Sequence, residues 1–266
     1  MRESWALIRA AWVTAASYRM GMFISLFGLV FVLLPLYFIA NALQPTMAHT
    51  IAGEAHQYFG FVVLGAVCFS LASICTTALP SAIGGAIGNG TLEAILGTPA
   101  RLRSICIGLM GYGVLWATLR AVILLTVAIW LGAAVMWRGV PLALGVMALT
   151  MLIYTGFGLV LAAIVMLFRT SGPLATVLLT GSMFLGGVYY PTSVIPSFLR
   201  DLAAFFPLTY GLRALRQIML RGDSFHHVAH DVQILALMTT ISLSVGTLMF
   251  CLALQRARRA GTLSSY

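Results

Sequence analysis

The chain has 266 residues, of which 61% are hydrophobic and only 8% are charged, and its mean hydropathy is +1.02. A soluble domain carries roughly 25% charged residues to solvate its surface, so this composition excludes a soluble globular protein. The formal net charge of +9 comes from arginine alone, and the arginines gather at the ends of apolar segments, which is typical of a membrane topology signal rather than of a nucleic-acid-binding surface.

The first predicted element covers residues 4–18. Trp5, Ile8 and Trp12 recur there at helical spacing, with arginines around them. This pattern predicts an amphipathic helix that lies in the headgroup region of the bilayer. A frayed cytoplasmic tail is the alternative.

Six apolar stretches follow, and each is close to the length of about 20 residues that a membrane-spanning helix needs. The predicted spans are residues 21–43, 58–79, 105–136, 141–168, 173–189 and 232–254. An even number of spans puts both termini on one side of the membrane. The sequence therefore predicts an all-α integral membrane protein, with residues 1–266 forming a single transmembrane domain.

The placement of arginine near the ends of the spans predicts the orientation, because cytoplasmic loops are enriched in basic residues. With the N-terminus inside, nine arginines are cytoplasmic: Arg2, Arg9, Arg19, Arg101, Arg103, Arg169, Arg256, Arg258 and Arg259. Five are external: Arg138, Arg200, Arg213, Arg216 and Arg221. We therefore expect both termini to be cytoplasmic.

The side chains that power many transporters are absent from the predicted spans. All six acidic residues lie outside them, namely Glu3, Glu54, Glu93, Asp201, Asp223 and Asp231. Proton-coupled transporters use intramembrane carboxylates or histidines, and the five histidines also fall in segments predicted to be external. No glycine-rich phosphate loop with its lysine is present. We expect no cofactor in this chain, so transport against a gradient would need energy from another polypeptide.

Arg120 lies near the middle of the third predicted span, where a charge costs on the order of 2.5 to 3.5 kcal/mol on insertion scales. One interpretation makes it a pathway residue that meets an anionic group of a substrate. The other makes it a structural arginine that bonds to backbone carbonyls or extends to an interface. An intramembrane enzyme is a third, unfavoured class, because besides Arg120 the spans offer only scattered Ser, Thr and Tyr.

The loop over residues 81–103 follows the second predicted span. Asn89 or Thr91 can cap a helix over residues 92–96, Glu93 lies in its first turn where the helix dipole favours an anion, and Pro99 ends it. The sequence therefore predicts a short cytoplasmic helix here. A plain connector is the alternative.

The run Gly90-Thr-Leu-Glu-Ala-Ile-Leu-Gly-Thr-Pro99, followed by arginines, resembles a loop of ATP-binding-cassette (ABC) exporter permeases of the type-two family. In that family the short helix is a coupling helix, which docks into a groove of the nucleotide-binding subunit. The resemblance implies that one face of this helix contacts the ATPase and that the residues after it fix the direction in which the chain leaves the loop. Its ATPase-coupling residues would be Thr91, Leu92, Glu93, Leu96, Pro99 and Arg101.

A second segment, residues 187–231, agrees with this resemblance. Pro191, Pro196 and Pro207 prevent one continuous helix and divide the segment into short pieces. The piece over residues 208–221 is amphipathic, and Gly222 is its stop. The pattern resembles the family's external helical hairpin, which partly re-enters the outer leaflet and which here would include Arg213 and Arg216.

The resemblance implies a half-transporter in a bacterial inner membrane. It would pair with a second permease copy or a paralogue and with two nucleotide-binding ATPase subunits, which hold the ATP and Mg. Membrane lipid surrounds such a protein, and nucleic acid has no role. The candidate pathway residues Phe184, Tyr189 and Tyr190 are aromatic, which favours a drug-like or lipid-like substrate, with a polysaccharide or lipid-linked glycan as the alternative.

Overall fold

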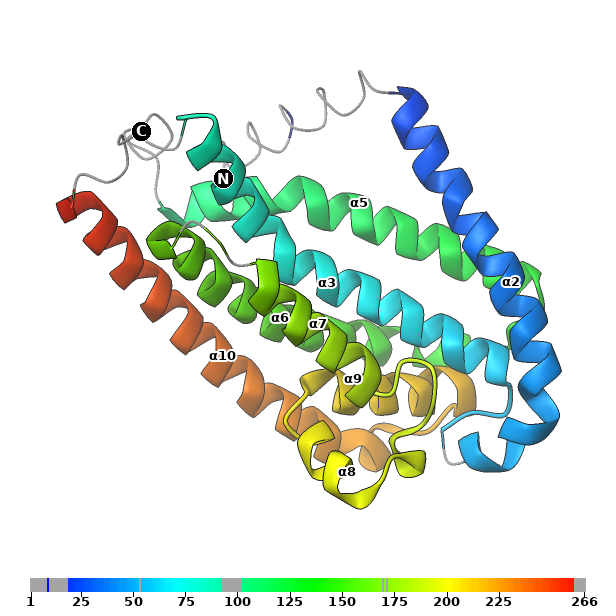
Figure 1. Cartoon of the computed structure of the whole chain (residues 1–266). Coiled ribbons are helices and arrows are strands. Elements are labelled where there is room, and N and C mark those ends of the chain that lie inside the picture. Colours follow the sequence, from blue (N-terminus) through cyan, green and yellow to red (C-terminus); the bar gives the residue numbers. More distant parts are fainter. Residues whose placement is uncertain are drawn as a thin grey trace.

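The computed structural model of the chain describes residues 19–52, 54–91, 102–168 and 172–260, together with Arg9 and Thr170. All regular secondary structure within these ranges is helical, so the all-α prediction is confirmed (Figure 1). The predicted interfacial helix over residues 4–18 lies outside the described residues except for Arg9.

Long helices that run side by side make up the bundle (Figure 1). They are α2 (Arg19–Ile51), α3 (Tyr58–Gly88), α5 (Leu102–Trp130), α6 (Val140–Phe168) and α10 (Phe225–Ala260), and the shorter α7 (Gly172–Leu185) lies beside them. Among the described residues, four segments are long and apolar enough to cross a membrane: Tyr58–Gly88, Ile105–Trp130, Trp137–Phe168 and Phe225–Ala257. The count of six spans stays a prediction.

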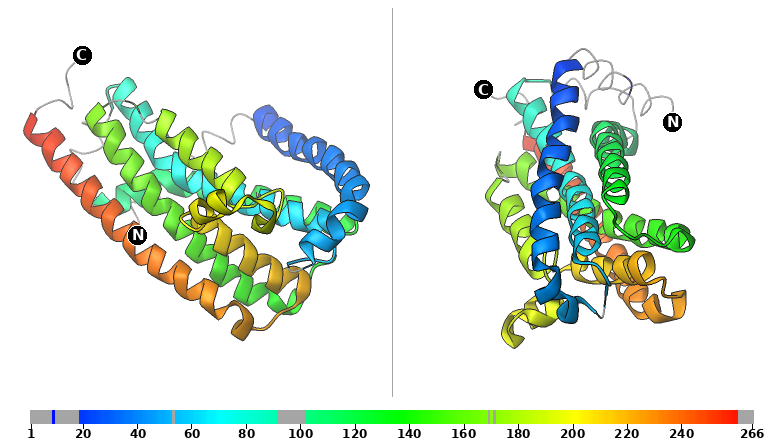
Figure 2. Two further views of the ribbon diagram at one scale, coloured as in Figure 1. Left: turned by 60° about the horizontal axis from the view of Figure 1, so that its bottom comes forward. Right: turned by 90° about the vertical axis from the view of Figure 1, so that its right-hand side faces the viewer.

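α2, α3, α5 and α6 alternate in direction and α10 runs parallel to α6, so the helix ends gather at two opposite ends of the bundle (Figures 1 and 2). We call one of these the loop end; α3 and α10 end there, at Gly88 and Ala260. We call the opposite one the hairpin end, because the short helices that precede α10 lie there.

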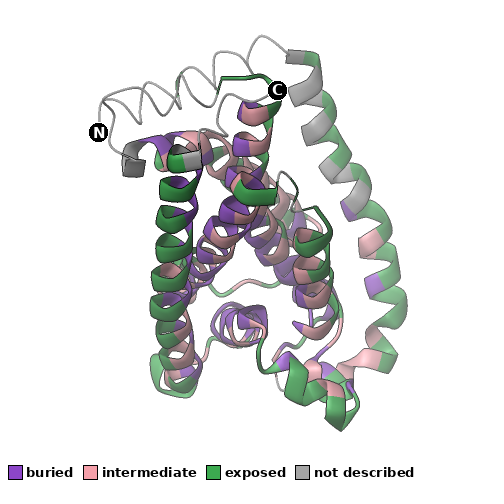
Figure 3. Cartoon of the chain, turned by 60° about the vertical axis from the view of Figure 1, so that its left-hand side comes forward, coloured by how far each residue is buried: buried purple, intermediate pink, exposed green. Residues whose placement is uncertain are grey.

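α3 is the central helix of the bundle. It packs against α2, α5, α6, α7 and α9, and most of its residues from Tyr58 to Ala86 are buried. The outer faces of α2, α5 and α10 expose large apolar side chains, such as Phe38, Val122 and Leu248 (Figure 3). A soluble monomer rarely exposes so much apolar surface, whereas lipid solvates it well. This distribution agrees with a bundle that lies in a bilayer.

The tightest helix pair is α6 with α10, and glycine makes the close approach of their backbones geometrically feasible. A Cβ atom at Gly246 would lie 2.5 Å from the carbonyl oxygen of Gly156, and a Cβ at Gly156 would collide with the backbone of Ser242. The Ser242 hydroxyl also donates a hydrogen bond across the interface to the carbonyl oxygen of Ile153, at 2.8 Å. Small residues allow membrane helices to pack backbone against backbone in this way.

The first three predicted segments differ at their ends from the helices. α2 continues to Ile51 rather than ending at residue 43. α3 continues through Pro80 to Gly88, so the loop expected from Ser81 begins at Asn89. α5 ends at Trp130 rather than at residue 136, because Gly132 turns the chain with a φ of +97°. Beyond that turn, the backbone N–H of Met136 donates to the carbonyl oxygen of Met219, at 2.8 Å.

The fifth and sixth predicted spans also differ from the helices at their ends. α7 ends at Leu185, before the expected residue 189, and Gly187 then adopts a φ of +76°. α10 begins at Phe225, within the segment assigned to the hairpin. α10 therefore begins seven residues before the predicted span over residues 232–254.

Candidate functional site

Short helical pieces follow α7 at the hairpin end, and the three prolines fall at their boundaries. Pro191 precedes a 3-10 turn (Thr192–Val194), Pro196 precedes α8 (Ser197–Ala203), and Pro207 is the first residue of α9 (Pro207–Arg216). Proline suits a first helical position, where its missing N–H would have no partner in the helix. A π-helical turn (Gln217–Arg221) follows α9. This turn ends at Gly222, which adopts a φ of +75°.

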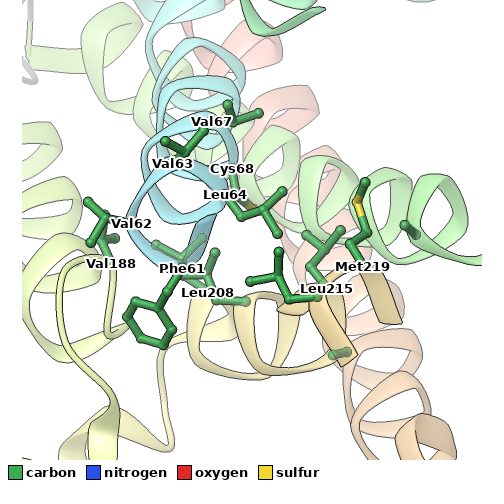
Figure 4. Close-up of a cluster of buried hydrophobic side chains, with 14 of the residues drawn as sticks. Phe61, Val62, Val63, Leu64, Val67, Cys68, Val188, Leu208, Leu215 and Met219 are labelled. Carbon is green, nitrogen blue, oxygen red and sulfur yellow. The ribbon is translucent and has the colours of Figure 1, made fainter. Parts of the chain in front are cut away.

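The amphipathic face predicted for residues 208–221 packs on α3. Its members are buried: Leu208, Leu212, Leu215 and Met219. Figure 4 shows Leu208 and Leu215 beside Phe61 and Leu64 of α3. α9 is therefore held against the central helix by its apolar face.

Arg216 lies on the same helix but is 1% exposed, and it uses all of its N–H groups. Nε and Nη2 donate to the carbonyl oxygen of Phe61, at 3.2 and 3.1 Å. Nη1 donates to the carbonyl oxygen of Gly187 at 3.0 Å, and Nη2 donates to that of Val188 at 2.9 Å. A guanidinium has five donors in a fixed geometry, so this environment suits arginine and would leave a lysine with fewer bonds.

Glu54, in the connection between α2 and α3, supplies the counter-charge. Its Oε2 lies 3.2 Å from Arg216 Nη1, and both side chains are largely buried. Burial lowers the pKa of Arg216 to about 10, and the attraction of Glu54 opposes that shift. The guanidinium thus stays charged at neutral pH. We call Arg216, Glu54 and the carbonyl groups of Phe61, Gly187 and Val188 the Arg216 cluster.

Gly65 makes room for this cluster within α3. A Cβ atom at Gly65 would lie 2.9 Å from Nη2 of Arg216 and would collide with the carbonyl oxygen of Val188. The connection after α7 can therefore lie directly on the surface of α3. The Arg216 cluster joins four parts of the chain: the α2–α3 connection, α3, the α7–α8 connection and α9.

A second ion pair ties α9 to α10. Arg213 donates from Nε to Oδ2 of Asp231 at 2.8 Å, and its Nη2 donates to Oδ1, so the pair is bidentate. The Asp231 side chain is 7% exposed and that of Arg213 is 37% exposed. The hydrogen bond to Asp231 raises the pKa of Arg213.

The aromatic pathway candidates lie near this hairpin. Tyr189 is 38% exposed, and its carbonyl oxygen accepts a hydrogen bond from the hydroxyl of Tyr58 at 2.8 Å. Tyr190 is half-buried, and Phe184 is exposed on α7. The structure thus brings these side chains to the same end of the bundle as Pro191, Pro196, Pro207, Arg213 and Arg216.

Arg120 lies apart from that group, within α5. Its side chain is half-buried, and among the described residues we find no hydrogen bond or ion pair for it. The interpretation that Arg120 is bonded to backbone carbonyls therefore has no support from the described part of the chain.

The predicted coupling loop begins at the loop end, directly after α3. Gly90 adopts a φ of +66°, its N–H donates to the carbonyl oxygen of Ile87, and the N–H of Thr91 donates to that of Ala86. These two bonds form a Schellman motif, which ends a helix at a left-handed glycine. Thr91 thus belongs to the end of α3. The other predicted coupling residues lie outside the described part: Leu92, Glu93, Leu96, Pro99 and Arg101.

Sequence reasoning missed the ion-pair partners Glu54 and Asp231, and it missed Gly65, which makes room for Arg216. One signal was available for Glu54, which is the only charged residue between Arg19 and Glu93. Its isolation in a connection between apolar segments indicates a dedicated partner. That the partner is Arg216, 162 positions later, follows only from the fold.

Comparison with known proteins agrees with this architecture. The family described as ABC-2 type transporter matches residues 2–220. Nodulation protein J of Rhizobium leguminosarum bv. trifolii is 31% identical over 165 residues, which are 62% of this chain and 63% of that protein. Nodulation protein J of Rhizobium leguminosarum bv. viciae is 27% identical over 201 residues, or 75% of this chain and 77% of that protein.

The Inner membrane transport permease YadH of Escherichia coli strain K12 is 22% identical over 218 residues, which are 81% of this chain and 84% of that protein. The chain thus covers less than two thirds of the trifolii relative and more of the other two. The family match includes both the predicted coupling loop and α9. The chain is a multi-pass, all-α membrane protein that belongs to the ABC-2 type transporter family.

Proposed function

We propose that this chain is the membrane-spanning permease subunit of an ATP-driven exporter and that a separate ATPase supplies its energy. The observation that carries the proposal is the family match over residues 2–220, in a sequence with no phosphate loop of its own. The chain would bind no cofactor, and ATP and Mg would be held by two ATPase subunits. A second permease copy or a paralogue would complete the membrane part.

We place the protein in a bacterial inner membrane with the loop end in the cytoplasm. Arg256 and Arg259 lie at the loop end of α10, as expected for cytoplasmic ends of spans. The name of one relative, Inner membrane transport permease YadH, supports the same membrane. The ATPase would then dock at the loop after Thr91, and the hairpin over residues 187–231 would lie at the external face.

The transported compound would pass the aromatic residues near the hairpin and Arg120 in α5. Arg120 is half-buried and would meet an anionic group, because a charge within the membrane needs a compensating partner. Phe184 and Tyr189 expose aromatic surface that suits an apolar or amphiphilic compound. We therefore propose a lipid-like or drug-like substrate with an acidic group.

The test is reconstitution of the chain with a candidate partner ATPase of the ATP-binding-cassette type. We expect the two proteins to co-purify, and we expect proteoliposomes that hold both to hydrolyse ATP and to move an acidic amphiphile. A partner ATPase whose phosphate-loop lysine is replaced is the matched control and should form the complex without transport. Selective stimulation of ATP hydrolysis by a glycan would replace the proposed substrate class.

The competing class, an intramembrane enzyme, predicts a different result in the same preparation. Such an enzyme would turn over a substrate without the ATPase, and one polar substitution within a span would abolish the turnover. Hydrolysis of ATP by the single chain above the level of contaminants would also overturn the proposal.

A further inference from the structure

The helices α6, α7 and α10 lie along one side of the bundle (Figures 1 and 2), and their side chains line a groove there. It consists of two hollows of about 580 and 550 Å³ that share Ile164 of α6 and Met249 of α10 in their linings. Each volume falls in the range of ordinary ligand sites. Because the hollows share a residue on each wall, they adjoin, and we call the two together the groove.

The α10 wall of this groove is a single helical stripe. Most of its members recur at intervals of three or four residues, which places them on one side of the helix: Met238, Ile241, Ser242, Val245, Met249, Leu252, Ala253, Gln255, Arg256 and Arg259. α6 supplies the facing wall with residues such as Phe157 and Ile164, and Leu174 and Leu178 of α7 border it.

The two ends of the groove differ in polarity. The hollow nearer the hairpin end is lined by apolar side chains apart from Ser242, whose hydroxyl is already bonded to Ile153. The hollow nearer the loop end includes Gln255, Arg256 and Arg259. Neither lining of described residues contains an acidic side chain. An apolar channel that ends in two guanidinium groups matches an amphiphile with an anionic head.

We propose that this groove binds an acidic phospholipid from the membrane leaflet at the loop end. Its phosphate lies at Arg256 and Arg259, and one acyl chain lies between α6 and α10 along Ile164 and Met249. Guanidinium groups bind phosphate oxygens in a bidentate manner, and basic pockets between membrane helices are known to hold anionic headgroups.

The dimensions agree with an occupant from a single leaflet. α10 rises about 16 Å from Val245 to Arg256, at 1.5 Å per residue, which is close to half of the hydrocarbon thickness of about 30 Å. Arg256 and Arg259 follow the uncharged stretch of α10 over residues 232–255, so they lie at the depth of headgroups. Lipid binding at this groove does not depend on the proposed transport activity.

The test measures lipid retained by the purified chain. After exchange into nanodiscs of equal phosphatidylglycerol and phosphatidylcholine, native mass spectrometry should find one phospholipid bound, with phosphatidylglycerol preferred about thirtyfold, as two basic groups near the surface predict. The double variant Arg256→Gln with Arg259→Gln should reduce this preference to below about twofold. Arg138→Gln removes an exposed arginine at the opposite end and should leave the preference unchanged.

A second pair of variants tests the acyl part of the groove. Met249→Trp places a large side chain where the two hollows meet and should displace the bound lipid. Leu248→Trp adds the same volume at a neighbouring position that is 61% exposed and lines neither hollow, so lipid retention should persist.

Three results would overturn the proposal. The first is equal retention of the two lipids by the wild type, and the second is an undiminished preference in the double variant. The third is a different occupant, seen as a bound mass that is no membrane phospholipid, or as a cross-link through Val245→Cys that joins two copies of the chain.

Discussion

Arg216 in α9 donates two hydrogen bonds to the carbonyl oxygen of Phe61 in α3, and its guanidinium carbon lies 3.3 Å from the centre of the ring of the same residue. The two residues are 155 positions apart. The Arg216 side chain thus hydrogen-bonds to the main chain of α3 and lies over the ring of Phe61. This one residue therefore fixes the hairpin to the central helix.

Replacement of Arg216 should destabilise the protein strongly. Arg216→Gln leaves Glu54 without its counter-charge and several carbonyl groups without donors, and breaking a buried pair in this way costs about 3 to 5 kcal/mol. Arg216→Lys should recover part of the loss, because it keeps the charge with fewer donors. The measurement is the free energy of unfolding in mixed micelles.

Arg200→Gln is the matched control for Arg216→Gln. Arg200 is exposed and donates to the carbonyl oxygens of Ser193 and Ile195 at the same end of the bundle. An exposed substitution of this kind should change stability by about 0.5 kcal/mol or less. Equal losses for the two variants would contradict the role assigned to the Arg216 cluster.

Two glycines of α6 should respond in opposite directions to alanine. Gly156→Ala forces a Cβ atom against the backbone of Ser242, and overpacking of this kind costs about 1 to 3 kcal/mol. At Gly145 no atom lies within 4 Å of an added Cβ, so Gly145→Ala should stabilise the helix by about 0.5 to 1 kcal/mol. Thermal unfolding of both variants in one detergent measures the difference, and losses of similar size would refute the packing argument.

Reversal of the charge at Glu93 should weaken the contact with the partner ATPase. Glu93 is the only acidic residue in the predicted coupling loop, and a disrupted charge pair at an interface costs about 2 to 5 kcal/mol when buried. We expect Glu93→Arg to reduce ATPase binding and substrate efflux at matched membrane levels. Asp201→Arg makes the same change on the exposed face of α8 and should leave both quantities as in the wild type.

The orientation can be tested with single cysteines in a variant that lacks Cys68, Cys75, Cys106 and Cys251. Ser264→Cys should stay unlabelled by an impermeant maleimide in intact cells, because the arginine distribution places the C-terminus inside. Ser197→Cys, at an exposed position in α8, should be labelled. The reverse pattern would invert the assigned topology.

The sequence predicts the local features of the hairpin well, because proline and glycine act on their own neighbours. Pro196 and Pro207 lie where α8 and α9 begin, and Gly222 ends the following turn with a left-handed conformation. The spacing of Leu208, Leu212 and Leu215 indicated the buried face for the same reason. Each inference needed only a few consecutive residues.

Features that depend on distant parts of the chain could not be predicted in this way. In the sequence, Arg213 and Arg216 look like arginines on a solvent-exposed helix face. Only the fold shows that they form ion pairs with Asp231 and Glu54. The connection after α5 likewise contacts a distant segment, through the hydrogen bond between Met136 and Met219. The residues that would contact an ATPase are assigned from family resemblance, and that assignment stays a prediction.

α3 connects the two regions on which the proposed mechanism depends. Its 31 residues form one unbroken helix from Tyr58 to Gly88, about 46 Å long at 1.5 Å per residue. Near its first turn, the carbonyl group of Phe61 accepts a hydrogen bond from Arg216. At its other end, the Schellman motif directly precedes the predicted coupling loop. α3 is therefore one rigid element that connects the two faces of the membrane. A displacement of Thr91 along the helix axis would move Phe61 and the hairpin bonded to it, because no loop interrupts the helix between them.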